Sequence, residues 1–113
     1  RQKGAWLMSH TERIRQLNDQ CRTSLAGCRV MITQGVSALD QTAVVLKAVR
    51  DYSNFRPDND PYGEHDFGCI AVAGYRLFWK FDYYDVDMQM ASLDPAEDTI
   101  TTRVLTIMLA DEY

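Results

Sequence analysis

Two runs rich in β-branched and aromatic residues, joined by a glycine, constrain the fold more than any other feature of this sequence. The first run spans residues 67–73, Gly74 follows, and the second run spans residues 76–84. Runs of this length and composition on either side of a glycine are typical of an antiparallel β-hairpin. Successive strand residues point to opposite faces, so the second run has an aromatic face for the core and another face that carries Lys80 and Asp82. The sequence therefore predicts a sheet with one buried side.

Helical patterns precede the hairpin. Ser9 and Glu12 stand three residues apart, as in a capping box, and they predict a helix over residues 11–22 with an apolar stripe on one side. A second helix is expected to end before the loop that leads into the hairpin. Ser37 and Asp40 are both suitable caps for this second helix, and the sequence does not choose between them.

Three further segments complete the predicted order. The β-rich run 29–33 is expected to be a strand, and residues 88–92 an additional short edge strand. After Asp98 or Thr99, apolar residues recur at helical spacing and predict a C-terminal helix, while the β-branched run 99–102 would also suit a strand. The order α-β-α-β-β-(β)-α predicts an α+β fold, in which a small antiparallel sheet of three to four strands has helices packed on one face.

The length of the chain suits one domain. The 113 residues, 46% of them hydrophobic, are enough to bury one core without a metal or a disulfide framework. We expect residues 9–113 to form this domain. Met8 followed by Ser9 resembles a translation start, so residues 1–8 are expected to be an N-terminal extension that need not be native.

The cysteines point to a reducing compartment, and the hydropathy points to a protein without a membrane-spanning helix. Cys21, Cys28 and Cys69 make an odd number and show no CxxC spacing, so we expect free thiols in the core rather than a disulfide framework or a zinc site. No apolar run reaches the roughly 18 residues that a membrane-spanning helix needs. We therefore expect a cytoplasmic protein that does not use a membrane.

The charge balance indicates the class of partner. Twelve Lys and Arg residues against sixteen Asp and Glu residues give a net charge of −4 at pH 7. Nucleic-acid binding needs a basic face that replaces phosphate counterions, so direct binding to nucleic acid is disfavoured. An acidic protein suits a partner protein with a basic surface.

Ionisable residues around the hairpin could support an enzyme. Glu64, His65 and Asp66 directly precede the first strand, and Lys80 and Asp82 share one face of the second. Such a group could carry out acid–base chemistry as a hydrolase or nuclease-like enzyme, with Mg²⁺ held by its carboxylates. The alternative interpretation is structural: the first three residues satisfy backbone groups where the loop enters the sheet, and Lys80 and Asp82 form an ion pair. We favour the structural interpretation and assign no metal or other cofactor.

A long loop offers a binding surface instead. Residues 53–64 include two prolines and a glycine, and irregular segments of this length are often functional. Acidic side chains there would meet a basic partner, and tyrosines frequently become hot spots of protein interfaces. The predicted partner-binding residues in this loop and at the end of the second hairpin strand are Asp58, Asp60, Tyr62, Glu64, Tyr83, Tyr84 and Asp85.

Three motifs carry a family resemblance. Residues 58–68 (DNDPYGEHDFG), 78–85 (FWKFDYYD) and 102–110 (TRVLTIMLA) resemble a bacterial family known as domain of unknown function 3768, over about residues 14–113. The resemblance implies no chemistry. It implies a short protein of the kind found among accessory genes of plasmids, phages and their hosts, which suggests an inhibitor of a bacterial defence system such as an anti-CRISPR or anti-restriction protein.

These observations favour a small non-catalytic protein-binding module that binds and blocks a bacterial protein. The enzyme described above is one alternative. A structural homodimer, in which the edge strand 88–92 pairs across a two-fold axis, is another.

Overall fold

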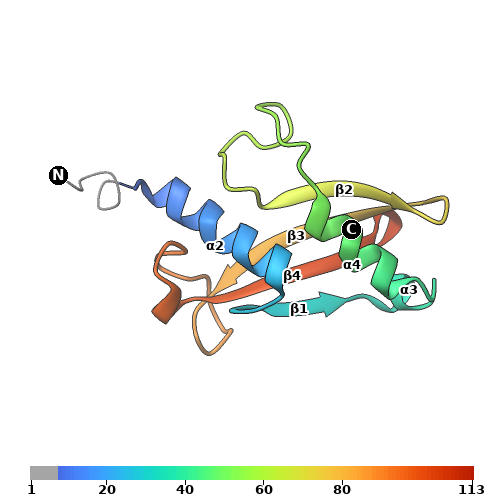
Figure 1. Ribbon diagram of the computed structural model, residues 1–113. Helices are drawn as coiled ribbons and strands as arrows, with labels where there is room; N and C mark the ends of the chain where they lie inside the picture. The colour runs from blue at the N-terminus through green and yellow to red at the C-terminus, as the bar shows by residue number, and fades with distance from the viewer. Residues whose placement is uncertain (1–7) are drawn as a thin grey trace.

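A four-stranded sheet forms the centre of the protein, whose computed structural model describes residues 8–113 (Figure 1). The strand order is β1-β4-β3-β2, with β1 parallel to β4 and the other neighbours antiparallel. The sheet is therefore mixed and mostly antiparallel, and the predicted α+β class is confirmed. Arg1 to Leu7, which belong to the predicted N-terminal extension, lie outside the described residues. The strands are β1 (Arg29–Ile32), β2 (Phe67–Val72), β3 (Tyr75–Tyr84) and β4 (Thr102–Leu109).

The first predicted helix is confirmed as α2 (His10–Ser24). The Ser9 hydroxyl accepts a hydrogen bond from the Glu12 amide at 3.0 Å, and the Glu12 carboxylate accepts one from the Ser9 amide at 3.0 Å. This capping box satisfies amides that the first turn of a helix leaves free. In residues 8–113 no helix is long and apolar enough to cross a membrane.

The second predicted helix is divided in two, and both of its predicted caps are wrong. A short α3 (Gln34–Ser37) is capped by the Thr33 hydroxyl, and Ser37 is its last residue. Asp40 lies in the following turn with a positive φ of 55°. The longer α4 (Thr42–Asp51) begins after that turn without a side-chain cap. The left-handed residue reverses the chain between the two helices, a conformation that Asp tolerates better than most residues.

The predicted hairpin is confirmed as β2 and β3. The turn residues Ala73 and Gly74 both have positive φ, which is the conformation that joins two strands through a two-residue turn. Gly68 of β2 lies opposite Trp79 of β3. A Cβ atom at Gly68 would collide with the Trp79 ring, so the glycine lets this large side chain lie directly on the strand.

The C-terminal segment is a strand and not the predicted helix. β4 lies between β1 and β3, and it is buried on both faces: Leu105 and Ile107 on one, Val104 and Met108 on the other. Residues 88–92 do not form the predicted edge strand either, because the only bridge there joins Ala91 to Tyr84. Two short 3₁₀ turns, η1 (Asp98–Ile100) and η2 (Ala110–Glu112), flank β4.

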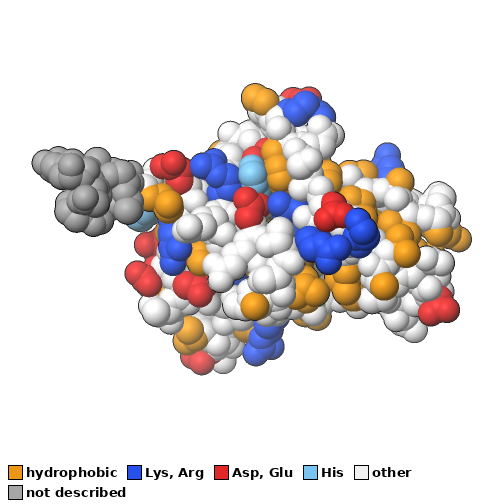
Figure 2. All heavy atoms as spheres, viewed as in Figure 1, with side chains coloured by type: hydrophobic (Ala, Val, Ile, Leu, Met, Phe, Trp, Pro, Cys, Tyr) orange, Lys and Arg blue, Asp and Glu red, His pale blue; other side chains and the backbone are white. Residues whose placement is uncertain are grey.

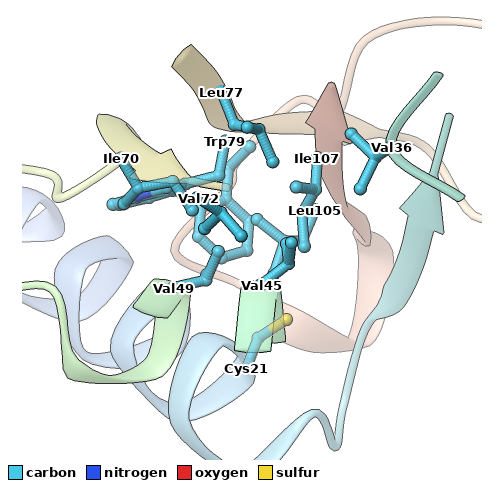
Figure 3. Close-up of a cluster of buried hydrophobic side chains, with 11 residues drawn as sticks. Cys21, Val36, Val45, Val49, Ile70, Val72, Leu77, Trp79, Leu105 and Ile107 are labelled. Atoms are coloured by element: carbon cyan, nitrogen blue, oxygen red, sulfur yellow. The ribbon is translucent and has the colours of Figure 1, made fainter. Parts of the chain in front are cut away.

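The main core lies between the helices and one face of the sheet (Figures 1 and 3). Val45 and Val49 of α4 and Cys21 of α2 point toward the strands in the close-up view. Val36 of α3 also belongs to this core. The strands contribute Ile70, Val72, Leu77, Trp79, Phe81, Leu105 and Ile107. Helices therefore pack on one face of the sheet, as predicted.

The expectation of three free core thiols is wrong. Cys21 of α2 and Cys28, just before β1, form a disulfide. The third cysteine, Cys69, is a free thiol on β2, and it is exposed rather than buried. A spacing of seven residues is not a recognised disulfide motif, and the pairing becomes apparent only when the helix end and the strand start are placed side by side.

Candidate functional site

The loop over residues 53–66, between α4 and β2, is ordered without any helix or strand. In Figure 1 this segment, yellow-green, projects from the body of the protein. The Asn59 side chain accepts a hydrogen bond from the Arg56 amide at 2.8 Å and donates one to the Asn54 carbonyl at 2.8 Å. The Asp60 amide donates to the Arg56 carbonyl at 2.8 Å. The projecting part of the 53–66 loop is therefore a set of bonded turns.

His65 attaches the 53–66 loop to α2. Its Nδ1 lies 3.0 Å from both carboxylate oxygens of Asp19, and its Nε2 lies 3.7 Å from the Asp60 carboxylate. The His65 amide also donates to Asp60 at 3.1 Å. The imidazole stacks on the Phe55 ring, with the ring centroids 3.6 Å apart. His65 thus lies between one carboxylate of the helix and one of the loop.

Arg22 extends this attachment to the end of α4. Arg22 is only 4% exposed. Its guanidinium donates a hydrogen bond of 2.9 Å to Asp19, the same carboxylate that His65 contacts. It also donates to three carbonyls at the C-terminal end of α4, those of Val49, Arg50 and Tyr52. A cation at this position satisfies carbonyls that the last helical turn leaves free and complements the helix dipole.

A second, buried network fastens the 53–66 loop at Glu64, the residue before His65. Asn18, fully buried on α2, donates to the Glu64 carbonyl at 3.1 Å and to the Tyr83 hydroxyl at 2.8 Å. Its side-chain oxygen accepts from Arg103 at 2.8 Å, and Arg103 also donates to Asp98 at 3.0 Å. The Tyr83 hydroxyl donates to the Glu64 carboxylate at 3.0 Å. Asn18 therefore joins the helix, the loop, β3 and β4.

Burial raises the pKa of three groups on the inner side of the loop. Burial raises the pKa of Glu64, and repulsion from Asp66 and Asp60 adds to the rise, while the hydrogen bond from Tyr83 opposes it. Burial likewise raises the pKa of Asp66. The pKa of Tyr83 is raised mainly by burial, so its hydroxyl remains neutral and able to donate. In Figure 2, acidic, basic and histidine side chains gather where α2 meets the loop.

The residues of the enzyme alternative lie on two sides of the sheet. Lys80 and Asp82 form an ion pair of 2.7 Å on the face opposite to Tyr83, because strand residues alternate. The partners of His65 in residues 8–113 are Asp19, Asp60 and the Phe55 ring, as given above, and no hydrogen bond or ion pair of these residues joins it to Lys80 or Asp82. Over the same range, no three His, Cys, Asp or Glu side chains are placed so that they could hold a metal ion.

The predicted partner-binding residues differ in exposure. Tyr62 is 75% exposed and the Asp58 side chain is 74% exposed, both on the projecting part of the loop. Asp60 is only 8% exposed, and its carboxylate is used by His65. The remaining predicted residues, Glu64, Tyr83, Tyr84 and Asp85, are half-buried. Tyr62 and Asp58 are therefore the two of this set that can reach a partner without rearrangement.

The sequence interpretation missed the residues that hold the loop. Asn18 and Asp19 lie on α2, for which the sequence predicts only packing, and Arg103 lies in an apolar run. The available signal was Arg103 itself, since a cation inside a buried strand requires polar partners.

The loop and α2 also enclose a shallow hollow of about 460 Å³, lined in part by Arg15, Tyr62 and His65.

A second exposed surface includes residues 88–92, the segment of the predicted edge strand. Val86, Met90 and Leu93 are 59%, 71% and 95% exposed, in a segment that follows β3. Residues 85–102 contain five acidic residues and no Lys or Arg. This segment offers an independent acidic and apolar surface, against which the 53–66 loop can be compared.

The comparisons with known proteins agree with the resemblance noted in the sequence. The family model described as "Protein of unknown function (DUF3768)" matches residues 32–112. No curated protein and no solved structure matches the chain. The matched region begins at the last residue of β1 and includes the 53–66 loop, the hairpin and β4. It covers well over half of the chain, and the protein therefore belongs to this family of proteins of unknown function.

Proposed function

We propose that this protein is a small non-catalytic protein-binding module and that the projecting part of the 53–66 loop contacts its partner. The observation that carries the proposal is the contrast within this loop. Its inner residues are held by the buried networks of Asn18 and His65, while Tyr62 is 75% exposed. Loops placed on a rigid scaffold are common binding elements.

Order before binding lowers the cost of association. A partner that must immobilise flexible side chains loses roughly 0.5–1.5 kcal/mol for each one. Here the bonds among Asn54, Arg56 and Asn59 already hold the turns. Tyr62 then presents a large aromatic surface with only two side-chain torsions, which suits a hot-spot residue.

Charge indicates the partner. The net charge is −4, and Asp58 and Tyr62 are both exposed in the loop. Arg56 pairs with Asp58 at 3.0 Å, so a basic partner would compete for a carboxylate that is already oriented. We therefore expect a protein with a basic surface, and electrostatic attraction should increase the rate of association more than the affinity.

The family resemblance supplies a setting for the first test. Accessory genes of plasmids and phages often encode proteins that block bacterial proteins, and an inhibitor of an anti-CRISPR or anti-restriction type would fit a small acidic binding module. This part of the proposal rests on the genetic context that the resemblance implies, and no residue of the chain carries it.

The test compares three tagged proteins as baits in bacterial lysates: wild type, Tyr62→Ala and Leu93→Ala. The Leu93 variant is the matched control, because it removes a large exposed side chain outside the 53–66 loop. The captured protein is then purified and titrated against all three. We expect about a tenfold or greater loss of affinity for Tyr62→Ala, equivalent to about 1.4 kcal/mol, and no change for Leu93→Ala.

Two outcomes would overturn the proposal. If Tyr62→Ala binds the purified protein as tightly as wild type and Leu93→Ala does not, the contact surface is residues 85–102 instead of the loop. If wild type captures nothing stoichiometric from hosts that carry different defence systems, the protein-binding function itself is wrong. Asp60 is unsuitable for this test because its burial would confuse a loss of binding with a loss of folding.

A further inference from the structure

The outer edge of β2 is an unpaired strand edge. The strand order β1-β4-β3-β2 places β2 at one end of the sheet (Figure 1). The Phe81 amide donates to the Asp66 carbonyl. Every second residue after Asp66 therefore also directs its backbone groups to β3, namely Gly68, Ile70 and Val72. By alternation, the backbone groups of Phe67, Cys69 and Ala71 point away from the sheet. No hydrogen bond of the described residues uses these outward groups.

This edge also lacks the features that usually keep edge strands apart. β2 has the sequence FGCIAV, without a charged residue or a proline, and it is six residues long. The opposite edge strand, β1, has four residues and carries Arg29. Proteins usually protect edge strands by shortness, charge, proline or a bulge. β1 has two of these protections and β2 has none of the first three.

We propose that the β2 edge binds the β2 edge of a second copy of this chain, antiparallel, with a two-fold axis at Cys69. In this register Cys69 lies opposite its own counterpart, and Phe67 lies opposite Ala71 of the second copy at both ends. Each of these three pairs exchanges two backbone hydrogen bonds, so every outward N–H and C=O of the three residues is satisfied. Two four-stranded sheets become one continuous sheet of eight strands.

The side chains of this register are self-complementary. Residues directly opposite each other in an antiparallel pair point to the same face. The large Phe67 therefore meets the small Ala71 twice, and the two Cys69 side chains meet between them. No like charges are brought together, although each chain has a net charge of −4. A second copy thus fits the edge by size and charge. Residues 88–92, through which the sequence predicts a homodimer, form a single bridge, from Ala91 to Tyr84 of the same chain, and offer no comparable edge.

The test measures molar mass by size exclusion with multi-angle light scattering. Cys69→Ser is the reference protein, because it keeps the size of the side chain and cannot form a disulfide between chains. Cys69→Lys places two ammonium groups opposite each other on the two-fold axis. Met31→Lys is the control, since it adds the same charge at a 54% exposed position of β1, the other edge strand.

The reference and Met31→Lys are expected to elute at twice 13.0 kDa, and Cys69→Lys at 13.0 kDa, with its dissociation constant raised about tenfold or more. Circular dichroism spectra that agree among all variants establish that each is folded. Two results would refute the proposal: a dimer of Cys69→Lys as tight as the reference, or a monomeric reference protein. If the reference is monomeric while wild type is a dimer, the wild-type dimer is held by an interchain disulfide only.

Discussion

Replacement of Asn18 by leucine, which has nearly the same shape, removes the side chain that joins α2 to the 53–66 loop and to both central strands. Three hydrogen bonds are lost, to Arg103, the Glu64 carbonyl and the Tyr83 hydroxyl. A bond to a charged group contributes about 1.5–3 kcal/mol and each neutral one about 1 kcal/mol. Arg103, 2% exposed, is left with an unpaired Nε in the core. We therefore expect the free energy of unfolding to fall by about 3–5 kcal/mol.

Urea denaturation at pH 7 measures this change as a shift of the midpoint at constant slope. Gln20→Leu is the matched control, because it makes the same kind of replacement at an exposed position of α2. The control should change the stability by less than about 0.5 kcal/mol. A loss smaller than about 1 kcal/mol for Asn18→Leu would refute the argument that this buried network holds the loop. If Asn18→Leu does not fold, Tyr83→Phe removes one hydroxyl of the same network and should cost about 1–2 kcal/mol.

Two further predictions concern a buried carboxyl and the disulfide. Burial raises the pKa of Glu64 above its ordinary value of 4.5, so the folded state holds this proton more tightly than the unfolded chain, and stability is lost as pH rises from about 4.5 through the raised pKa. A glutamine side chain cannot ionise, so the Glu64→Gln variant should lose less of its free energy of unfolding between pH 4.5 and pH 7 than wild type does. An equal loss in the two proteins would contradict the assignment. Closing the seven-residue separation of Cys21 and Cys28 contributes about 2.5 kcal/mol, so Cys28→Ser should lower the denaturation midpoint accordingly. Thiol titration of the protein after denaturation without a reductant should find one thiol per chain, that of Cys69, and three would exclude the disulfide.

The parts of the fold that depend on local pattern could be predicted from the sequence. The Ser9 and Glu12 capping box requires only residues three apart, and it begins α2 as expected. The turn at Gly74 is equally local, since a glycine in the left-handed region suffices to reverse a hairpin. These signals involve neighbours in the chain and do not depend on the rest of the structure.

β4 could not be assigned because its burial hides the pattern. Residues on both faces are buried, so Val104, Leu105, Ile107 and Met108 form a nearly continuous apolar run. Such a run fits the helical period as well as the strand period. Only the position of β4, paired on both sides within the sheet, decides in favour of a strand.

The candidate site could be predicted only in its exposed half. Loop length and composition identified residues 53–64 as a candidate surface, and Tyr62 in this loop is exposed. The supporting half depends on pairs far apart in the chain, such as Asn18 with Arg103, which are separated by 85 residues. No local pattern encodes such a pair. For the same reason the sequence predicts Asp60 as a partner-binding residue, although it is buried beside His65.

Hydrogen exchange of the protein, free and bound to the protein that wild type captures, tests the central claim most directly. In the free protein the Asp60 and His65 amides are hydrogen-bonded and should exchange slowly. On binding, residues 57–63 should gain the largest protection, because we propose that the exposed Tyr62 and Asp58 contact the partner. Protection confined to residues 85–93, with no change in the 53–66 loop, would contradict the account.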